Sequence, residues 1–318
     1  MKKNIMQLLL IVLFLLSLIG AAYVVLSNKI AQSKSKSSLT GVFAKKISKP
    51  NAIGIIHISG PIYAGQRGSV LAGTGNPDQI VKKLKTFRED SDIKAVLLRI
   101  NSPGGSVASV QEIYREIMLM RKQGKIVVAS MADVAASGGY YIASAADKIV
   151  ANPGTITGSI GVIMETGNLQ ELFKKIGVKL EVIKSGTHKD SGSPHRPLTA
   201  EERKIFQGLI DNAYDQFIDA IIEGRHMDKS KLLRLATGRV FTGEQAAGNG
   251  LIDELGGKME AIDLAARLAQ IKGEPRIIET TEPWSQFFSF IDNMLPSFAE
   301  PYARILNKRS IRLDYILE

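Results

Sequence analysis

Two stretches of the 318-residue chain, Lys94-Ala-Val-Leu-Leu-Arg-Ile100 and Lys125-Ile-Val-Val-Ala-Ser-Met-Ala132, decide the fold that it can adopt. Both are apolar on each face of an extended strand, which is typical of a parallel sheet covered by helices on both sides. The segment between them, Ser109–Lys122, has the length and the apolar pattern of a helix. A strand, a helix and a strand in this order predict an α/β core.

The same alternation extends in both directions from this unit. Upstream, a strand at Ala52–Ser59 precedes a Gly-rich loop over Gly65–Asn76. Downstream, Thr199-Ala-Glu-Glu202 has the spacing of a capping box and opens the longest helical pattern, which reaches about Glu223. The other predicted strands are Lys148–Ala151, Ile160–Met164 and Val178–Lys184; the other predicted helices are Pro77–Phe87, a short one ending at Ala146, Asn168–Ile176, Lys229–Leu235, Glu244–Ala247 and Lys258–Ala269.

The N-terminus predicts a membrane anchor. Ile5–Leu26 is uncharged and almost wholly apolar, and at about 1.5 Å per residue a helix of this length spans the ~30 Å hydrocarbon layer. A cleavable signal peptide is the alternative, because small residues stand at Gly20–Ala22, but the apolar run continues past them. We expect a transmembrane signal-anchor over 1–28, with the short N-terminus inside and the bulk of the chain outside, and a Ser- and Lys-rich tether over 29–50.

The remainder divides into a folded domain over 51–270 and a C-terminal tail over 271–318. Trp284 and several Phe crowd into a short stretch of that tail. Such aromatic density suits docking onto a neighbouring subunit, the membrane interface or the chain's own core.

Composition argues against several classes of function. The chain has no Cys, which removes thiol nucleophiles, thiolate metal sites and disulfides. Its net charge of +10 comes from Lys and Arg scattered among acidic residues, so we expect a basic surface near an anionic membrane and no nucleic-acid partner. The sequence contains no phosphate loop, no H-E-x-x-H zinc helix and no G-x-S-x-G nucleophile elbow. Neither a metal nor a nucleotide cofactor is expected.

The run Val134-Ala-Ala-Ser-Gly-Gly-Tyr-Tyr141 is a candidate catalytic segment. It follows a buried strand and opens a helix, so Ser137 would lie at a helix N-terminus beside free backbone amides. On this pattern alone, an ordinary Ser N-cap is the commoner case. A second Gly-rich turn, Asn101–Gly105, has the same ability to donate amides to an oxyanion. Of the four His, only His188 stays a candidate base.

Five motifs in a fixed order carry a resemblance to a known family. They are Asn101–Gly105 (NSPGG), Ala135–Tyr141 (AASGGYY), Thr157–Gly161 (TGSIG), Lys184–Asp190 (KSGTHKD) and Gly238–Gly243 (GRVFTG). Together they resemble the signal peptide peptidase A family of bacteria, in the half-length form with one catalytic domain per chain. The resemblance covers about residues 52–268. It implies a Clp protease and crotonase-like α/β fold with repeated ββα units, and a serine peptidase domain over 51–270.

The resemblance also implies the roles of individual residues. Ser137 matches the family nucleophile and Lys189 its general base, while Ser159 matches a serine that positions the lysine. The amides of Gly105 and Gly138 match the oxyanion hole. A free lysine, with a pKa near ~10.4, is protonated at neutral pH, so Lys189 must be desolvated to accept the serine proton. Without the family pattern, Lys189 would be an ordinary solvated loop lysine.

These matches predict a membrane-anchored endopeptidase that degrades signal peptides and other membrane-derived peptides at the bacterial cytoplasmic membrane, on its extracytoplasmic side. A related protease acting on intact membrane proteins and a noncatalytic crotonase-like scaffold are the alternatives. Members of the family with two fused domains place serine and lysine in different halves. We therefore expect a ring-like homo-oligomer in which Ser137 of one chain meets Lys189 of the next, although the spacing also allows both residues to meet within one chain.

Overall fold

The computed structural model describes residues 51–64, 75–279 and 314–317. The predicted signal-anchor and tether, nearly all of the Gly-rich loop and the aromatic stretch of the tail lie outside these residues. In the ranges that are described, no helix combines the length and the apolar character needed to cross a membrane.

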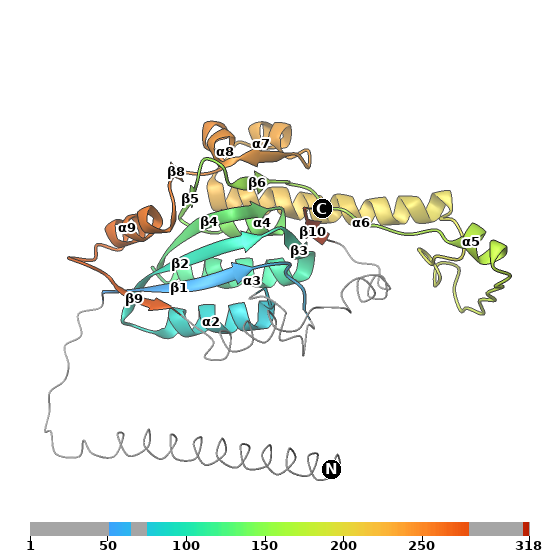
Figure 1. Cartoon of the computed structure of the whole chain (residues 1–318), viewed down its shortest axis with the longest axis horizontal. Helices are drawn as coiled ribbons and strands as arrows, with labels where there is room; N and C mark the ends of the chain where they lie inside the picture. The colour runs from blue at the N-terminus through green and yellow to red at the C-terminus, as the bar shows by residue number, and fades with distance from the viewer. Residues whose placement is uncertain (1–50, 65–74, 280–313, 318) are drawn as a thin grey trace, which may run out of the picture. The chain divides into compact units, whose positions relative to one another are not determined.

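A mostly parallel sheet forms the centre of the described domain (Figure 1). Its order is β7-β6-β4-β2-β1-β9, and all neighbours in this order are parallel except β6 and β7. The long strand β4 pairs with β2 along one edge and, along the other, first with β5 and then with β6. The bounds are β1 Ala52–Ser59, β2 Ile93–Ser102, β4 Ile126–Ala136, β5 Lys148–Ala151, β6 Ile156–Gly158, β7 Val240–Thr242, β8 Glu254–Leu255 and β9 Arg276–Glu279. A second sheet joins β3 (Gly104–Ser106) to β10 (Asp314–Ile316).

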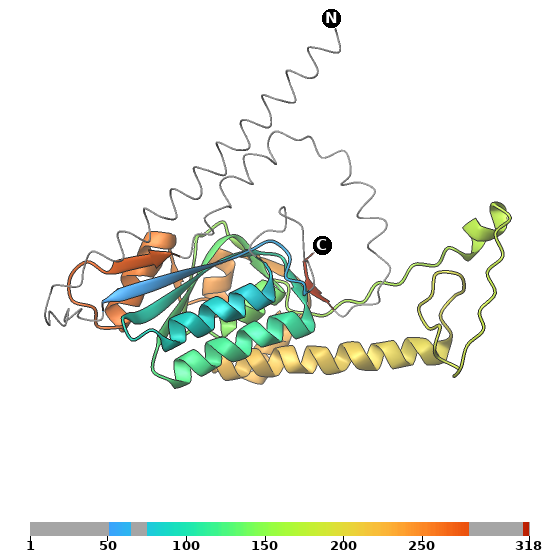
Figure 2. The ribbon, with the colours of Figure 1, turned by 90° about the horizontal axis from the view of Figure 1, so that it is seen from below.

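Helices cover both faces of the main sheet (Figures 1 and 2). On one face lie α2 (Pro77–Glu89), α3 (Val107–Lys122), α4 (Gly138–Ser144) and the long α6 (Ala200–Arg225), and on the other lies α9 (Lys258–Leu268). The remaining described helices are α5 (Gln170–Lys175), α7 (Lys229–Leu235) and α8 (Gly243–Asn249). The predicted α/β class is therefore confirmed.

The period-two alternation of strand side chains explains this layering. In β1, Ile53 and Ile55 belong to the apolar cluster under α9, whereas Ile56 and Ile58 belong to the cluster on the opposite face. Every one of these side chains is fully buried. Both faces of the strand are therefore covered, which explains why its sequence is a continuous apolar run and does not alternate with polar residues.

A cluster of three aromatic rings packs α6 against the rest of the domain. Phe217 of α6 lies 4.9 Å from the ring of Tyr141 in α4 and 4.7 Å from the ring of Tyr315 in β10, measured between ring centroids. Tyr315 also donates a hydrogen bond of 2.7 Å to the carbonyl of Ala213, one turn earlier in α6. Burial of three large rings makes this cluster a strong apolar contact.

Most predicted elements are present within a few residues of their expected bounds, but three differ. Ile160–Met164 is not a strand; the neighbouring residues Ile156–Gly158 pair with β4 instead. Val178–Lys184 alternates like a strand, but in the structure it is largely exposed and pairs with no described strand. The predicted turn at Asn101–Gly105 contains the short strand β3.

Gly54 tests the packing of α2 on the sheet. A Cβ at this position would come within 2.4 Å of the Phe87 ring, so Gly54→Ala is expected to lower the free energy of unfolding by about 1–3 kcal/mol. Gly154→Ala is the matched control, because nothing lies within 4 Å of its added Cβ; its change is expected to stay within about 0.5 kcal/mol. Urea denaturation of both variants measures the difference, and equal stability of the two would contradict this packing.

Candidate active site

Ser137 lies at the junction of β4 and α4, at the carboxyl end of a central parallel strand. Its amide donates a 2.8 Å hydrogen bond to the carbonyl of Gly158, and its own carbonyl accepts one of 2.8 Å from the amide of Tyr141. The first bond ties it to the end of β6 and the second begins helix α4. Ser137 is therefore fixed on both sides by secondary structure.

The backbone of Ser137 is strained. Its φ of 53° and ψ of −115° fall outside the regions that a residue with a Cβ prefers. The side chain does not act as an N-cap, and its Oγ is buried without a hydrogen-bond partner among the described residues. Strain of this kind persists only where the surrounding structure imposes it, and it concentrates at active sites. A buried, unpartnered hydroxyl is equally unusual in a merely structural serine.

Ser159 repeats this geometry at the end of the neighbouring strand. It follows β6 with a φ of 50°, is nearly buried, and donates its amide to the carbonyl of Arg239 at 2.8 Å. Parallel pairing of β4 with β6 thus places the two serines next to each other at one edge of the sheet.

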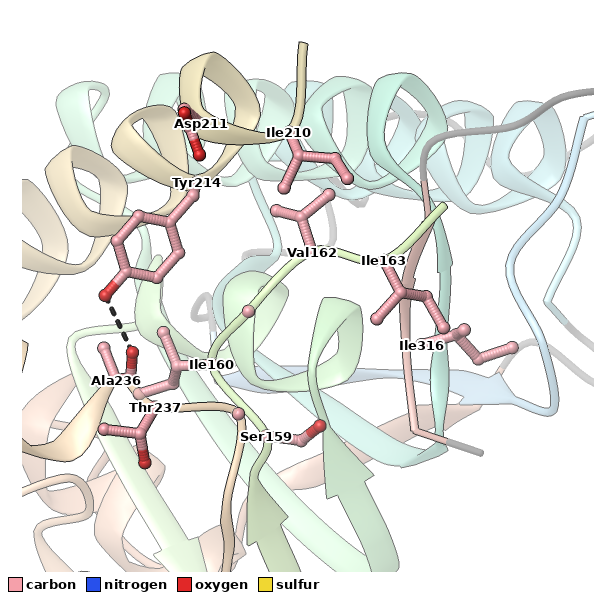
Figure 3. A pocket seen from close by; sticks show the side chains of 12 residues that line it. Ser159, Ile160, Val162, Ile163, Ile210, Asp211, Tyr214, Ala236, Thr237 and Ile316 are labelled. Carbon is pink, nitrogen blue, oxygen red and sulfur yellow. Dashed lines mark hydrogen bonds between the residues drawn. The ribbon is translucent and has the colours of Figure 1, made fainter. Parts of the chain in front are cut away.

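A hollow of about 440 Å³ opens beside Ser159 (Figure 3). Its walls come from the chain after β6, from α6, from the loop before β7 and from Ile316 of β10, and they combine apolar side chains with polar groups. Tyr214 of α6 closes one side, with its hydroxyl donating to the carbonyl of Ala236 at 2.7 Å. The hollow gives a side chain from outside a way to reach Ser159.

Glycines surround a peptide carbonyl near Ser137. In the antiparallel pair of β3 and β10, Tyr315 stands opposite Gly105. A Cβ built on Gly104 would lie 1.9 Å from the carbonyl oxygen of Tyr315 and 2.6 Å from the amide nitrogen of Gly138, and one built on Gly138 would lie 3.0 Å from that oxygen. Only glycine allows the backbones to approach this closely.

The structure does not bring Lys189 to Ser137. Lys189 is exposed, and together with α5 it belongs to a segment, residues 165–198, that lies beyond the N-terminal end of α6 and away from the sheet in both views (Figures 1 and 2). We call this segment the arm. Glu202, in the first turn of α6, and Phe217, which contacts Tyr141 of α4, are 15 residues apart. This spacing corresponds to about 22 Å along the helix axis.

The arm exposes apolar side chains over most of its length. Seven of its large apolar residues have relative exposures of 41% or more, and Ile183 is exposed completely. They are Leu169, Leu172, Ile176, Val178, Leu180, Val182 and Ile183. The arm therefore carries a high density of exposed apolar side chains within a short stretch of sequence.

The root of the arm is held by ion pairs. Arg196 donates to both carboxylate oxygens of Asp190, at 2.7 and 3.0 Å, and to both of Glu202, at 2.5 and 2.8 Å. Hydrogen bonds from Arg196 and then from Lys184 hold the pKa of Asp190 well below its usual range. The pKa of Glu202 is lowered in the same way, first by Arg196 and then by the Thr199 amide. The sequence predicts Glu202 only as part of a capping box, and no pattern in it indicates the contacts of Asp190 and Arg196.

The histidines have other partners. His188 lies 3.6 Å from Glu201 on the arm side, and His57 forms a short contact with Glu279 between β1 and β9. His195 contacts the hydroxyl of Ser193 at 3.3 Å. These three histidines therefore offer Ser137 no base within the described residues.

Comparison with known proteins points to one class of enzyme. The sequence profile of peptidase family S49 matches residues 120–272, and that of Clp protease matches residues 72–155. A Synechocystis protein named "Putative protease slr0021" is 42% identical over 80% of this chain and 89% of its own length. An Enterococcus faecium protein named "Putative signal peptide peptidase SppA" is 36% identical over 80% of this chain and 70% of its own length. "Protease 4" of Haemophilus influenzae is 37% identical over 74% of this chain, but the match covers 38% of its length.

The pH dependence of stability tests the ion pairs at the arm root. A carboxyl whose pKa is lowered by folding stabilises the folded state above its unfolded pKa of ~4.3, and this contribution is lost as the pH falls toward the folded pKa. The difference in free energy of unfolding between the wild type and Glu202→Gln should therefore be constant from pH 7 to about 5 and shrink below about pH 4. Urea denaturation at fixed pH measures this difference in free energy of unfolding.

Glu171→Gln, which removes an exposed ion pair with Lys174, is the control and should show little difference from the wild type at any pH. A difference for Glu202→Gln that persists undiminished at pH 3 would contradict the assignment.

Proposed function

Because the chain belongs to peptidase family S49 and is a serine peptidase, we propose that Ser137 is its nucleophile and Lys189 its general base. The observation that carries the proposal is the strained, buried and unpartnered Ser137 at the head of α4. Ser137 Oγ attacks the substrate carbonyl while the neutral Lys189 amine takes its proton and then gives it to the leaving amine. Water hydrolyses the resulting ester and regenerates the serine.

The amides of Gly105 and Gly138 form the oxyanion hole in this proposal. The position of Tyr315 supports it, because Tyr315 pairs with Gly105 and its carbonyl oxygen lies against Gly104 and Gly138. The carbonyl of a bound substrate would have to lie in the same place. Backbone amides fixed by a strand and a helix N-terminus stabilise a developing negative charge without reorganising. Ser159 orients the lysine, because it ends the strand next to the one that ends at Ser137 and faces the hollow.

The dyad is shared between subunits. Three observations support this: Lys189 lies on an exposed arm, the rigid helix α6 separates that arm from its own Ser137, and the arm exposes apolar side chains that another molecule can cover. Entry of Lys189 into the hollow beside a neighbour's Ser159 would remove water from its ammonium group, which favours the neutral amine that a base requires. Repetition of this head-to-tail contact closes a ring.

The substrate binds as an extended strand. Strand β10 lies antiparallel on β3 beside the site, and a peptide added at this edge would take its place with main-chain hydrogen bonds to β3. Apolar side chains in the wall of the hollow, such as Ile160, Val162 and Ile210, suit peptides that come from membranes, such as signal peptides. One relative bears the name of a signal peptide peptidase. A chain anchored by residues 1–28 with its domain outside would meet such peptides at the cytoplasmic membrane.

Cleavage rates of a signal peptide and of an intact membrane protein distinguish this substrate from the alternative, a protease that acts on intact membrane proteins.

Substitutions of the two proposed catalytic residues test the chemistry. Ser137→Ala and Lys189→Ala should each lower the rate of peptide hydrolysis by at least about 100-fold with the fold unchanged by circular dichroism. Lys189→Arg should be equally inactive, because a guanidinium stays protonated. His188→Gln is the control and should change the rate only modestly. If Lys189→Ala kept more than a tenth of the wild-type rate at neutral pH, the assigned base would be wrong.

Mixing two inactive variants tests whether the site is shared. Ser137→Ala chains still carry a usable Lys189, and Lys189→Ala chains still carry a usable Ser137. If the dyad forms between subunits, co-assembly of these variants should restore activity at the contacts where both residues are intact. Light scattering of the mixture confirms that the chains assemble together. Complete inactivity at every mixing ratio would instead place both catalytic residues within one chain.

A further inference from the structure

The turn that carries Lys189 is held by charges and hydrogen bonds instead of apolar packing. Residues 177–189 are all exposed, so no core fixes this part of the arm. The turn lies between Gly186 and Gly192, which have φ values of 92° and 77° that glycine adopts without strain. What fixes the turn is a group of four charged residues, which we call the turn cluster: Lys184, Asp190, Arg196 and Glu202.

Asp190 is the member of the turn cluster next to Lys189. Its carboxylate accepts Lys184 Nζ at 2.5 Å and both donors of the Arg196 fork. Two bonds from a planar guanidinium fix both the position and the orientation of a carboxylate. The backbone one residue after Lys189 is thereby held in place.

Glu202 connects the turn to a rigid element. It lies in the first turn of α6, its side chain is 3% exposed, and it closes the capping box with Thr199. The same carboxylate accepts Arg196 and the hydroxyl of Ser191, at 2.7 Å, so the second residue after Lys189 is also tied to the helix. Both residues that follow Lys189 are therefore anchored, directly or through Arg196, to α6.

Charge balance adds a second effect. The two cations of the turn cluster match its two carboxylates, and Asp190 is occupied by both Lys184 and Arg196. Lys189 itself makes no ion pair or side-chain hydrogen bond with any described residue. Further titratable groups of this part of the chain are His188, which lies 3.6 Å from Glu201, and His195, which contacts the hydroxyl of Ser193. Because Lys184 and Arg196 occupy the Asp190 carboxylate, the residue next to Lys189 in the chain is not available to pair with the Lys189 ammonium and keep it protonated.

We propose that Asp190 and Arg196 are positioning residues for the general base: they fix the turn that presents Lys189 and keep its amine free of a carboxylate partner. The inference rests on the proposed role of Lys189. It assigns no chemical step to either residue.

Kinetics of Asp190→Asn and Arg196→Ala test the inference in the assembled enzyme. Both variants should lower kcat about 10- to 100-fold, the loss expected when a catalytic group is displaced by about 1 Å, with KM within about two-fold of wild type. Glu171→Ala, which removes the exposed ion pair between Glu171 and Lys174 elsewhere on the arm, is the matched control and should leave both constants unchanged.

The pH profile of kcat separates positioning of the base from a merely structural role. Asp190→Asn removes one of the two carboxylates of the turn cluster, while Arg196 stays paired with Glu202. The cluster is left with one excess positive charge, which disfavours the Lys189 ammonium, so the acid limb should move to lower pH. Arg196→Ala releases a carboxylate oxygen of Asp190, which favours the ammonium, so the limb should move to higher pH. Opposite shifts of this kind are not expected from a general loss of stability.

The outcomes distinguish this inference from the proposed dyad. Wild-type kcat and an unshifted acid limb in both variants, with Lys189→Ala inactive, would overturn the positioning role and leave the dyad intact. Activity in Lys189→Ala would overturn the dyad and the inference together. If either variant fails to fold or assemble, Ser191→Ala removes only the bond between Ser191 and Glu202. It should lower kcat several-fold at unchanged KM, and a wild-type kcat in this variant would overturn the inference.

Discussion

The hydrogen bond from the Ser137 amide to the Gly158 carbonyl is the contact on which the candidate site depends. It closes the pairing of β4 with β6, and this pairing is possible because β4 continues for several residues after its pairing with β5 ends. The register of this pairing then places Ser137 and Ser159 next to each other, each with a positive φ. Neither conformation is favourable for a serine alone, so the ladder must impose both.

Helix α6 determines what the rest of the chain can contribute to that site. Near its middle, the aromatic contact of Phe217 with Tyr141 joins it to the helix that Ser137 begins. At its N-terminal end, Glu202 holds the root of the arm that carries Lys189. A continuous helix with a satisfied capping box does not fold back on itself, so one rigid element keeps the two proposed catalytic residues of a chain apart. The proposed sharing of the dyad follows from this separation.

Local patterns predict the described helices and the four strands β1, β2, β4 and β5, because the relevant signals lie within a few residues. The remaining described strands, which are two to four residues long, are not predicted at their positions. The capping box at Thr199 and the apolar run of β1 are examples, and both are found as predicted. The prediction of a strand over Val178–Lys184 is wrong. Its alternation of apolar and polar residues is typical of a strand with one covered face, but no described strand pairs with this segment. The Ser137 segment could be recognised from sequence as a Gly-rich turn, but its positive φ depends on the pairing with β6. The bond network of Asp190 and Arg196 joins residues six apart through side chains, for which no simple periodicity gives a signal.

A polar anchor suits an arm that must keep its shape before it meets a partner. Apolar packing would fix the turn only after the exposed side chains of the arm were covered, whereas the ion pairs at its root form within the chain itself. In the proposed assembly, the arm would therefore present a preorganised lysine to another subunit and lose less conformational freedom on binding. In the proposed mechanism, a single chain holds both the nucleophile and the base in their final conformations. The two residues do not meet within that chain. Hydrolytic activity would then appear only when subunits assemble. Because the proposed substrate binding relies on main-chain hydrogen bonds, which many peptides can make, assembly would restrict cleavage to the site where the subunits meet.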